Sequence, residues 1–490
     1  MAQTFVQPRE VRAITFTHEY AFTMKRLAWW TLAITAIAAA AYALVGFPPS
    51  FDTYFQKMYF HAIGIGIAAL AAYLVLDVFE LEAYEPALDF PIRYRAFISV
   101  VFAALAGLVF LNRDVFLALP DIGVLLFTIA FILAFDVTAA LLVELIILPR
   151  KKAAIYDSRS RNLLDYVGRL VPAKAADRSA YAGLGAGYWL TVISLASVFV
   201  AEIIGFANLW VRVFGPSVFS GLVTWLGVDA EGFQAATLDP HSHMIAIALL
   251  GIIVAVAAVR IGIFNSESRV RRMTAQAGAW MALVGVILTT LVLGAVAFLN
   301  FAPPDVFTSG PDGANSMAGD DLIMTIVFVG AMVVVAAVLA SRAAWREGLR
   351  LTVLSTLVAS FAITVLEGLY IEMNHDQFGA GLAKATNDAS FVAAHPMAGL
   401  FVMILLGLSL LLVEFYGVPG RARLSTIGLA AAGVVAAVVG TTLWTFVDPS
   451  QSGIAFGLYV AALVLSVAAV LASGFAVRSA RTEAFDRTTS

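Results

Sequence analysis

The residues of this chain best suited to chemistry are three histidines, each at the head of a long apolar stretch. His61 stands in YFHAIGIG, His241 in DPHSHMIAIALL and His395 in AAHPMAGL, and the whole chain has only six histidines. Ionisable side chains inside a membrane span are costly and usually functional. Heme iron is the first ligand to expect, because apolar helices offer the macrocycle a dry slot between imidazoles. Copper and non-heme iron come second, since imidazole suits both.

Two glutamates and two further histidines complete the candidate set. Glu202 in ASVFVAEIIGF and Glu367 in ASFAITVLEGLY each stand in the outer part of an apolar stretch. We predict them as catalytic acids that line a second site. His241, His243 and His375 are the predicted metal ligands there, because imidazole and carboxylate together suit copper or non-heme iron. The alternative is that these side chains only form hydrogen bonds between helices.

The composition indicates an integral membrane protein. Of the 490 residues, 61% are hydrophobic and 13% are charged, which is typical of a polytopic helical protein and excludes a soluble globule. The chain has no cysteine, so disulfides, thiolate metal sites and iron–sulfur ligation are excluded. The polar first 26 residues contain no secretory cleavage site, so we expect the first helix to be retained. The bilayer is the expected partner and nucleic acid is not.

Apolar runs long enough to cross the roughly 30 Å hydrocarbon layer occur about twelve times. Their approximate limits are 27–47, 56–79, 95–112, 117–148, 186–210, 241–264, 276–300, 322–341, 350–372, 392–416, 424–447 and 453–477. With a cytoplasmic N-terminus, 26 of the 30 basic residues lie on the inner side, and the exceptions are Lys57, Arg113, Arg212 and Lys384. This bias predicts that both termini are cytoplasmic. We expect a multi-pass protein of a prokaryotic-type plasma membrane.

The spans also suggest an internal repeat within one transmembrane domain, 1–490. Spans two, six and ten each begin with a histidine, and nineteen residues later, about one bilayer crossing, comes a charged residue: Glu80, Arg260 and Glu414. The pattern predicts three four-helix units at approximately 27–148, 186–341 and 350–477. Between the first two lies a basic cytoplasmic loop, 149–185. Within span six, Asp239-Pro240 predicts a helix start, with Asp as cap and Pro in the first turn.

The pattern resembles the catalytic subunit of the heme–copper oxidase superfamily, including the large subunit of nitric oxide reductase. That family has twelve spans, cytoplasmic termini and a pseudo-threefold arrangement of four-helix units. Its low-spin heme is held by one histidine on helix two and one on helix ten, both toward the outer side. The matching positions here are His61, in YFHAIG, and His395, in AAHPMAG, so the resemblance implies that these two ligate a heme b.

The sequence departs from the family at the dinuclear centre. Helix six of the family places its histidine deeper, before a Tyr- or Glu-containing motif, whereas this helix reads HSHMIAIALLG. Span seven, QAGAWMALVGVILTT, has no histidine, and the tenth helix has one where the family usually has two. The dinuclear oxygen-reducing centre is therefore not evident.

Three functions follow from these residues. The first is a heme-binding membrane oxidoreductase or electron-transfer subunit that acts on nitric oxide or oxygen. It would take electrons from a quinol or a small external redox protein, with other membrane subunits as further partners. The second is a proton- or metal-coupled secondary transporter that uses Glu202 and Glu367. The third is a metal-free structural subunit of a membrane complex.

Overall fold

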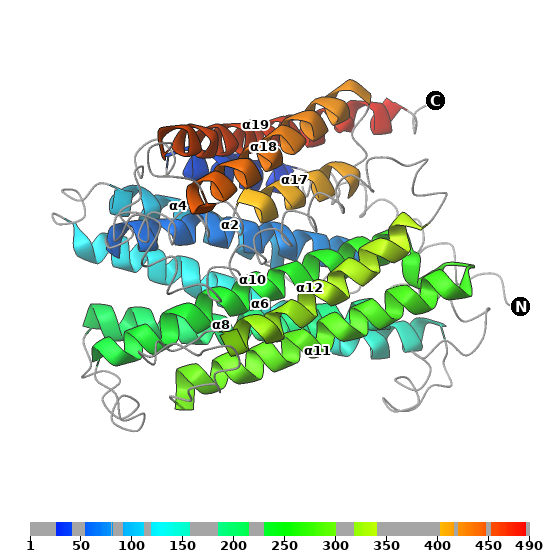
Figure 1. The fold of residues 1–490 in the computed structure, drawn as a ribbon, viewed down its shortest axis with the longest axis horizontal. Helices are drawn as coiled ribbons and strands as arrows, with labels where there is room; N and C mark the ends of the chain where they lie inside the picture. The colour runs from blue at the N-terminus through cyan, green and yellow to red at the C-terminus, as the bar shows by residue number, and fades with distance from the viewer. Residues whose placement is uncertain are drawn as a thin grey trace, which may run out of the picture.

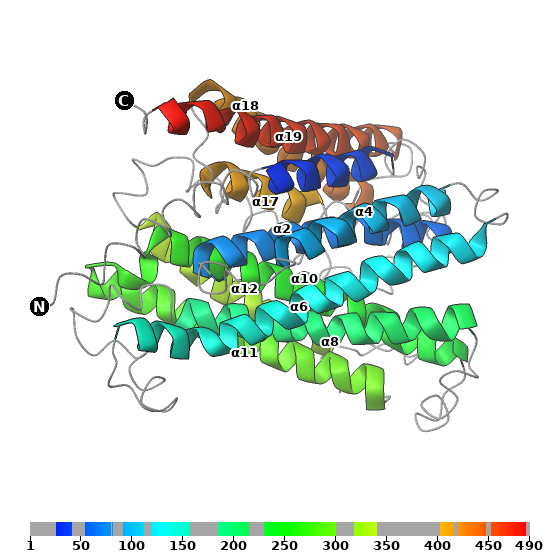
Figure 2. The ribbon, with the colours of Figure 1, turned by 180° about the vertical axis from the view of Figure 1, so that it is seen from behind.

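The computed structural model describes residues 26–41, 54–79, 81, 92–111, 119–156, 185–214, 230–299, 318–340, 402–415, 420–446 and 452–486. All regular structure in these ranges is helical. The helices run along the long axis of the molecule and lie side by side, as Figures 1 and 2 show from opposite sides. The fold is therefore a helical bundle with its long axis along the helices.

The helices follow the predicted spans closely. After a first helix, Arg26–Ala41, come α2 (Tyr54–Phe79), α4 (Ile92–Leu111), α6 (Pro120–Tyr156), α8 (Ala186–Phe214), α10 (Ala230–Ile261), the 3-10 turn η1 (Ile263–Asn265), α11 (Arg269–Leu299), α12 (Ala318–Leu339), α17 (Met403–Phe415), α18 (Gly420–Phe446) and α19 (Ser452–Asp486). Seven helices within these described ranges are long and apolar enough to cross a membrane. Within the described residues, the prediction of an all-helical, multi-pass membrane protein is confirmed. The predicted ninth span, 350–372, lies outside the described residues, so the count of twelve stays a prediction.

Three helices form the centre of the bundle. Helices α2, α10 and α17 contact one another pairwise. The apolar stretch of α10 is 78% buried within the protein, whereas that of α6 is only 28% buried. Peripheral helices instead expose large apolar side chains such as Leu125 and Leu291. In a bilayer such side chains face lipid tails, which do not penalise them.

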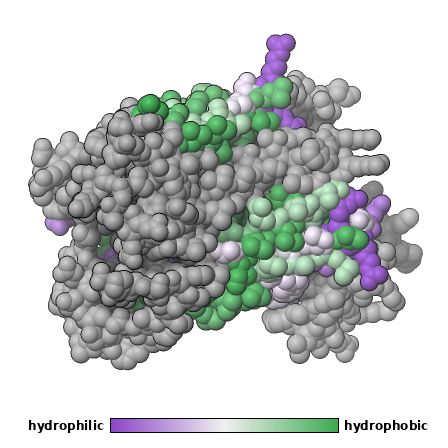
Figure 3. Space-filling view, viewed as in Figure 1, coloured by the Kyte–Doolittle hydropathy of each residue, from purple (hydrophilic) through white to green (hydrophobic). Residues whose placement is uncertain are grey.

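The surface shows the same division. Figure 3 shows hydrophobic side chains along the flanks of the described helices and hydrophilic side chains gathered toward their ends. This distribution is the one that a membrane span requires, because the flank meets hydrocarbon and the ends meet water.

Helices α11 and α12 approach each other closely through two glycines. A Cβ atom placed on Gly278 would lie 2.7 Å from the carbonyl oxygen of Gly330, and one on Gly330 would meet the backbone of Ala282. Small residues at such crossings let two backbones pack in direct contact, which is a principal source of helix association in a membrane. An alanine at either glycine would push the two helices apart.

The prediction that a helix starts at Asp239-Pro240 is wrong. Helix α10 begins at Ala230 and contains Pro240 in its interior. The preceding residues, AEGFQAAT, include alanine, glutamate and glutamine, which favour helix, and their propensity outweighs the stop signal of one proline. Pro240 removes one backbone hydrogen bond, a loss that transmembrane helices commonly tolerate. His241 and His243 are thus held on a continuous helix rather than in its first turn.

Candidate functional site

Two of the predicted histidines meet at one end of the central helices. The imidazole rings of His61 on α2 and His241 on α10 lie with their centroids 5.9 Å apart and their planes 23° from parallel. The edge of Phe127, from α6, closes one side of His61 at a centroid distance of 5.3 Å. The sequence assigned these two histidines to separate sites, and the fold makes them neighbours.

The seat of His241 is built by α8. Its Nδ1 lies 2.7 Å from the carbonyl oxygen of Ala201. Because a carbonyl oxygen only accepts, Nδ1 carries the hydrogen, and the lone pair of Nε2 stays available. Gly205, one turn further along α8, leaves the space that the ring fills, since a Cβ atom there would overlap the imidazole. The amide of Asn208 then donates to the hydroxyl of Thr237 on α10 at 2.6 Å.

Glu202 lies next to Ala201 in sequence but turns toward α6. Its side chain is 7% exposed. The hydroxyl of Thr138 lies 3.1 Å from its Oε1 and 3.2 Å from the carbonyl oxygen of Ala134, so its one hydrogen is shared between two acceptors. The second carboxyl oxygen, Oε2, has no hydrogen-bond partner within the described ranges. One residue of α8 thus serves His241 and the next presents a buried carboxyl group to a neighbouring helix.

Glu202 lines a cavity whose wall comes from five helices. The cavity, of about 30 Å³, lies between α2, α4, α6, α8 and α10. Its lining is alanine, valine, leucine and isoleucine except for Ser99, Thr138 and Glu202. Ile65, one turn after His61 on α2, is also part of the wall. The cavity with the carboxyl group and the histidine pair are therefore adjacent along the axis of the bundle.

Of the remaining predicted ligands, only His243 lies within the described residues. His243 lies on α10 two residues after His241, so the two side chains leave different faces of the helix. In the part of the chain that the structure describes, His and acidic side chains do not gather in a group of three that could hold a metal. His375, His395 and Glu367 lie outside the described residues. The heme ligation predicted for His61 and His395 stays a prediction.

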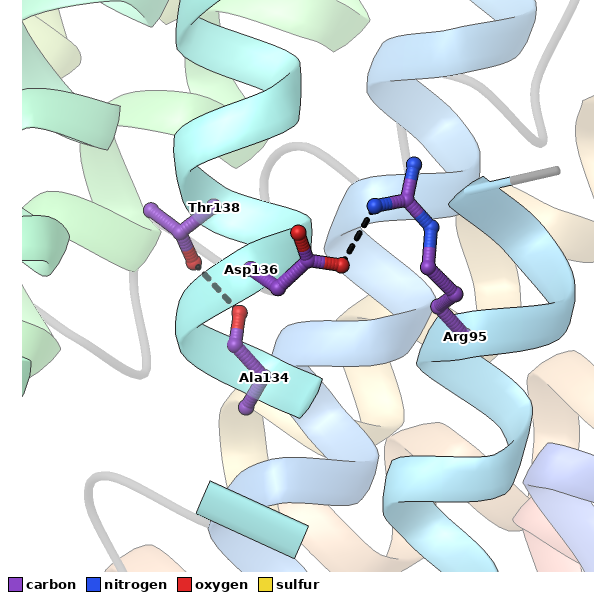
Figure 4. Close-up of polar contacts among 4 residues, drawn as sticks. All are labelled: Arg95, Ala134, Asp136 and Thr138. Atoms are coloured by element: carbon purple, nitrogen blue, oxygen red, sulfur yellow. Dashed lines mark hydrogen bonds and ion pairs between the residues drawn. The ribbon is translucent and has the colours of Figure 1, made fainter. Parts of the chain in front are cut away.

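A second set of charged residues lies at the opposite end of α2. Arg93, at the start of α4, forms an ion pair of 2.5 Å with Asp77, near the end of α2. Two residues on, Arg95 pairs with Asp136 on α6. Figure 4 shows Asp136 directed toward Arg95 while Thr138, two residues later on α6, points away from that pair.

These ion pairs were not predicted from the sequence, where the arginines indicated only the orientation of the chain in the membrane. The spacing nevertheless indicates them, because Arg93 and Arg95 stand two positions apart at the start of one span and each adjacent span holds an aspartate. The buried Arg93 could have been suspected from that spacing.

Comparison of the chain with protein-family models, with curated proteins and with solved structures found no match. The site must therefore be interpreted from its own geometry.

Proposed function

We propose that this protein is a heme-binding integral membrane oxidoreductase or electron-transfer subunit, built as twelve spans in three four-helix units with both termini in the cytoplasm. The observation that carries the proposal is the pair of imidazoles, His61 and His241, brought within 5.9 Å of each other at the same end of two central helices. Histidines at this depth of a bundle are the usual anchors of membrane redox centres.

The arrangement of the central helices supports the repeat. Helices α2, α10 and α17 fall at the second position of the three proposed units, and they are the helices that contact one another pairwise. A pseudo-threefold bundle places its second helices around the axis in this way. The histidine-headed helices would then converge on one region, and the tenth span would bring His395 to it.

The two described imidazoles are close enough to belong to two adjacent centres. Their ring centroids lie 5.9 Å apart. His241 also has the outer-shell partner that metal-bound histidines commonly use, a backbone carbonyl on the nitrogen that does not face the metal. His61 and His241 would each supply one ligand to its own centre, and further ligands would come from His375, His395 or Glu367.

The roles of the residues follow from this placement. Bound heme, copper or non-heme iron would supply one-electron chemistry. His61 and His395 would hold heme b, and His241 with His243 would belong to a second metal site beside it. Glu202 and Glu367 would line that site as its catalytic acids. A quinol or a small external redox protein would deliver electrons.

The test is an absorption spectrum and metal analysis of the purified full-length chain. We expect a Soret band and bound iron that are lost in His61→Ala and His395→Ala. His18→Ala is the matched control, because His18 precedes the first span, and it should leave both signals unchanged. Retention of the band in His395→Ala with its loss in His241→Ala would assign the heme to the described pair instead.

A chain with no Soret band and no bound iron or copper would contradict the proposal. Substrate uptake into vesicles that Glu367→Gln abolishes would then support the transporter. Co-purification of the metal-free chain with a second redox protein would support a structural subunit.

A further inference from the structure

The cavity between α2, α4, α6, α8 and α10 combines an apolar wall with three polar side chains. Its volume of about 30 Å³ exceeds the 10–15 Å³ that one water molecule needs by this measure. Water also needs polar partners, and Ser99, Thr138 and Glu202 provide them within the lining. The cavity is therefore suited to hold water inside the membrane part of the protein.

Glu202 is the one acidic side chain in that lining. It is more than nine-tenths buried, and one of its oxygens lacks a hydrogen-bond partner among the described residues. The described part of the chain also offers it no ion pair. Burying an unpaired carboxylate costs free energy, which favours the neutral carboxyl group. Because the cavity beside Glu202 has room for water, its carboxyl group is suited to take up and release a proton.

We propose that Glu202 and this cavity form an internal proton-binding site. A hydronium ion in the cavity transfers its proton to the carboxylate, which leaves a neutral carboxyl group and a water molecule, and the reverse step releases the proton. The inference does not depend on a metal centre, because it uses only the carboxyl group, its neighbour Thr138 and the cavity.

A proton fits this site better than a metal cation does. Hard cations such as Ca²⁺ take six to eight oxygen ligands, and the lining supplies only two hydroxyl groups and one carboxyl group. The hydroxyl of Ser99 already donates to the carbonyl oxygen of Ala130 at 2.7 Å, and that of Thr138 donates to Glu202. A proton needs only the free oxygen of the carboxyl group.

Other ionisable groups on the surrounding helices determine what this proton can reach. They include His61 and Asp77 on α2, Arg93 and Arg95 on α4, Asp121, Asp136 and Glu144 on α6, His241 and His243 on α10, and Arg269, Arg271 and Arg272 in the first turn of α11. Asp77 and Arg93 offset each other as an ion pair. Arg95 and Asp136 offset each other as an ion pair. His241 is the group most directly linked to Glu202, because it binds the carbonyl of the adjacent residue, Ala201. Glu202 is thus linked to the histidine pair through the backbone of Ala201, the residue before it on α8.

The experiment uses N,N′-dicyclohexylcarbodiimide, an apolar reagent that adds to protonated carboxyl groups. The acid proton moves to one nitrogen and the carboxyl oxygen to the central carbon, and the product rearranges to a stable N-acylurea that contains all atoms of both reactants. Full-length protein in lipid vesicles is labelled across a pH series and mapped by peptide mass spectrometry. We expect the adduct on Glu202, with labelling that falls as the pH rises.

Two variants and one competition sharpen the outcome. Glu202→Gln should abolish the adduct, whereas Asp136→Asn, the matched acid in an ion pair, should leave it unchanged. Addition of sodium ions at constant pH should not protect Glu202. An adduct found only on other acids, or full protection by sodium, would overturn the proposal. If Glu202→Gln does not fold, the peptide map of the natural chain still decides. Loss of the Soret band in any of these samples bears on the heme proposal alone.

Discussion

The two ends of α2 bury polar groups in opposite ways. Near its C-terminal end, charged side chains neutralise one another, as Asp77 does with Arg93. Near its other end, the ring of His61 stacks against a second imidazole, and the buried carboxyl group of Glu202 close by has one oxygen without a partner in the described residues. Paired charges are typical of structural roles, whereas polar groups buried without compensation usually mark function. We therefore assign a structural role to the C-terminal end of α2 and a functional role to the end that carries His61.

The largest effect should come from breaking the paired end. Asp77→Asn leaves the guanidinium of Arg93, which is 3% exposed, without its carboxylate. Removing one partner of a buried ion pair costs about 3–5 kcal/mol. The free energy of unfolding measured by denaturant titration in detergent should fall by that amount. The control is Asp121→Asn in the exposed first turn of α6, where loss of a charge near a helix start costs under about 1 kcal/mol. Equal losses in both variants would mean that the pair is not structural.

The next largest loss of stability should come from filling the space that Gly205 leaves for the His241 ring. Gly205→Ala places a methyl group where the ring lies, and such overpacking costs about 1–3 kcal/mol. Gly294→Ala on α11 is the matched control, because a Cβ atom there meets nothing within 4 Å. That variant should gain about 0.5–1 kcal/mol from the lower flexibility of alanine in a helix. Thermal unfolding of both proteins would measure the difference, and a stabilised Gly205→Ala protein would show that the ring sits elsewhere.

The smallest effect concerns the hydroxyl that contacts Glu202. Thr138→Val removes a hydrogen bond between α6 and α8, and such bonds in membrane proteins average about 0.6 kcal/mol and reach about 1.7 kcal/mol. Thr128→Val is the matched control in the same helix, because among the described residues the Thr128 hydroxyl binds the carbonyl of Val124, within that helix. Unfolding titrations should show a loss for Thr138→Val alone. Indistinguishable curves for the two variants would contradict the contact.

The helices were predictable because span length and hydrophobicity are properties of consecutive residues. The run 186–210 became α8, and the run 117–148 became α6, whose 37 residues exceed what one bilayer crossing needs. Local signals were weaker at Pro240, where the helix propensity of the preceding segment outweighed the proline. The ends of helices depend on such competition between small free-energy contributions, which composition alone does not resolve.

The histidine pair was only half predictable. Both His61 and His241 could be selected because an imidazole at the head of an apolar stretch is unusual. Their contact could not, since it depends on which helices lie at the centre of the bundle and how each is rotated. The same holds for Thr138 and Glu202, which are 64 residues apart. One clue was available: Gly205 lies three residues after Glu202, where a missing side chain leaves room for a neighbour.

Two polar contacts between α8 and α10 fix the register of the two helices. Apolar helix surfaces alone specify the register less sharply, because their side chains resemble one another. The His241–Ala201 and Asn208–Thr237 contacts engage α8 at points seven residues apart, about 10 Å along its axis. One contact would permit rotation about itself, whereas two at this spacing do not. A movement of α8 relative to α10 would therefore have to break at least one of these two contacts.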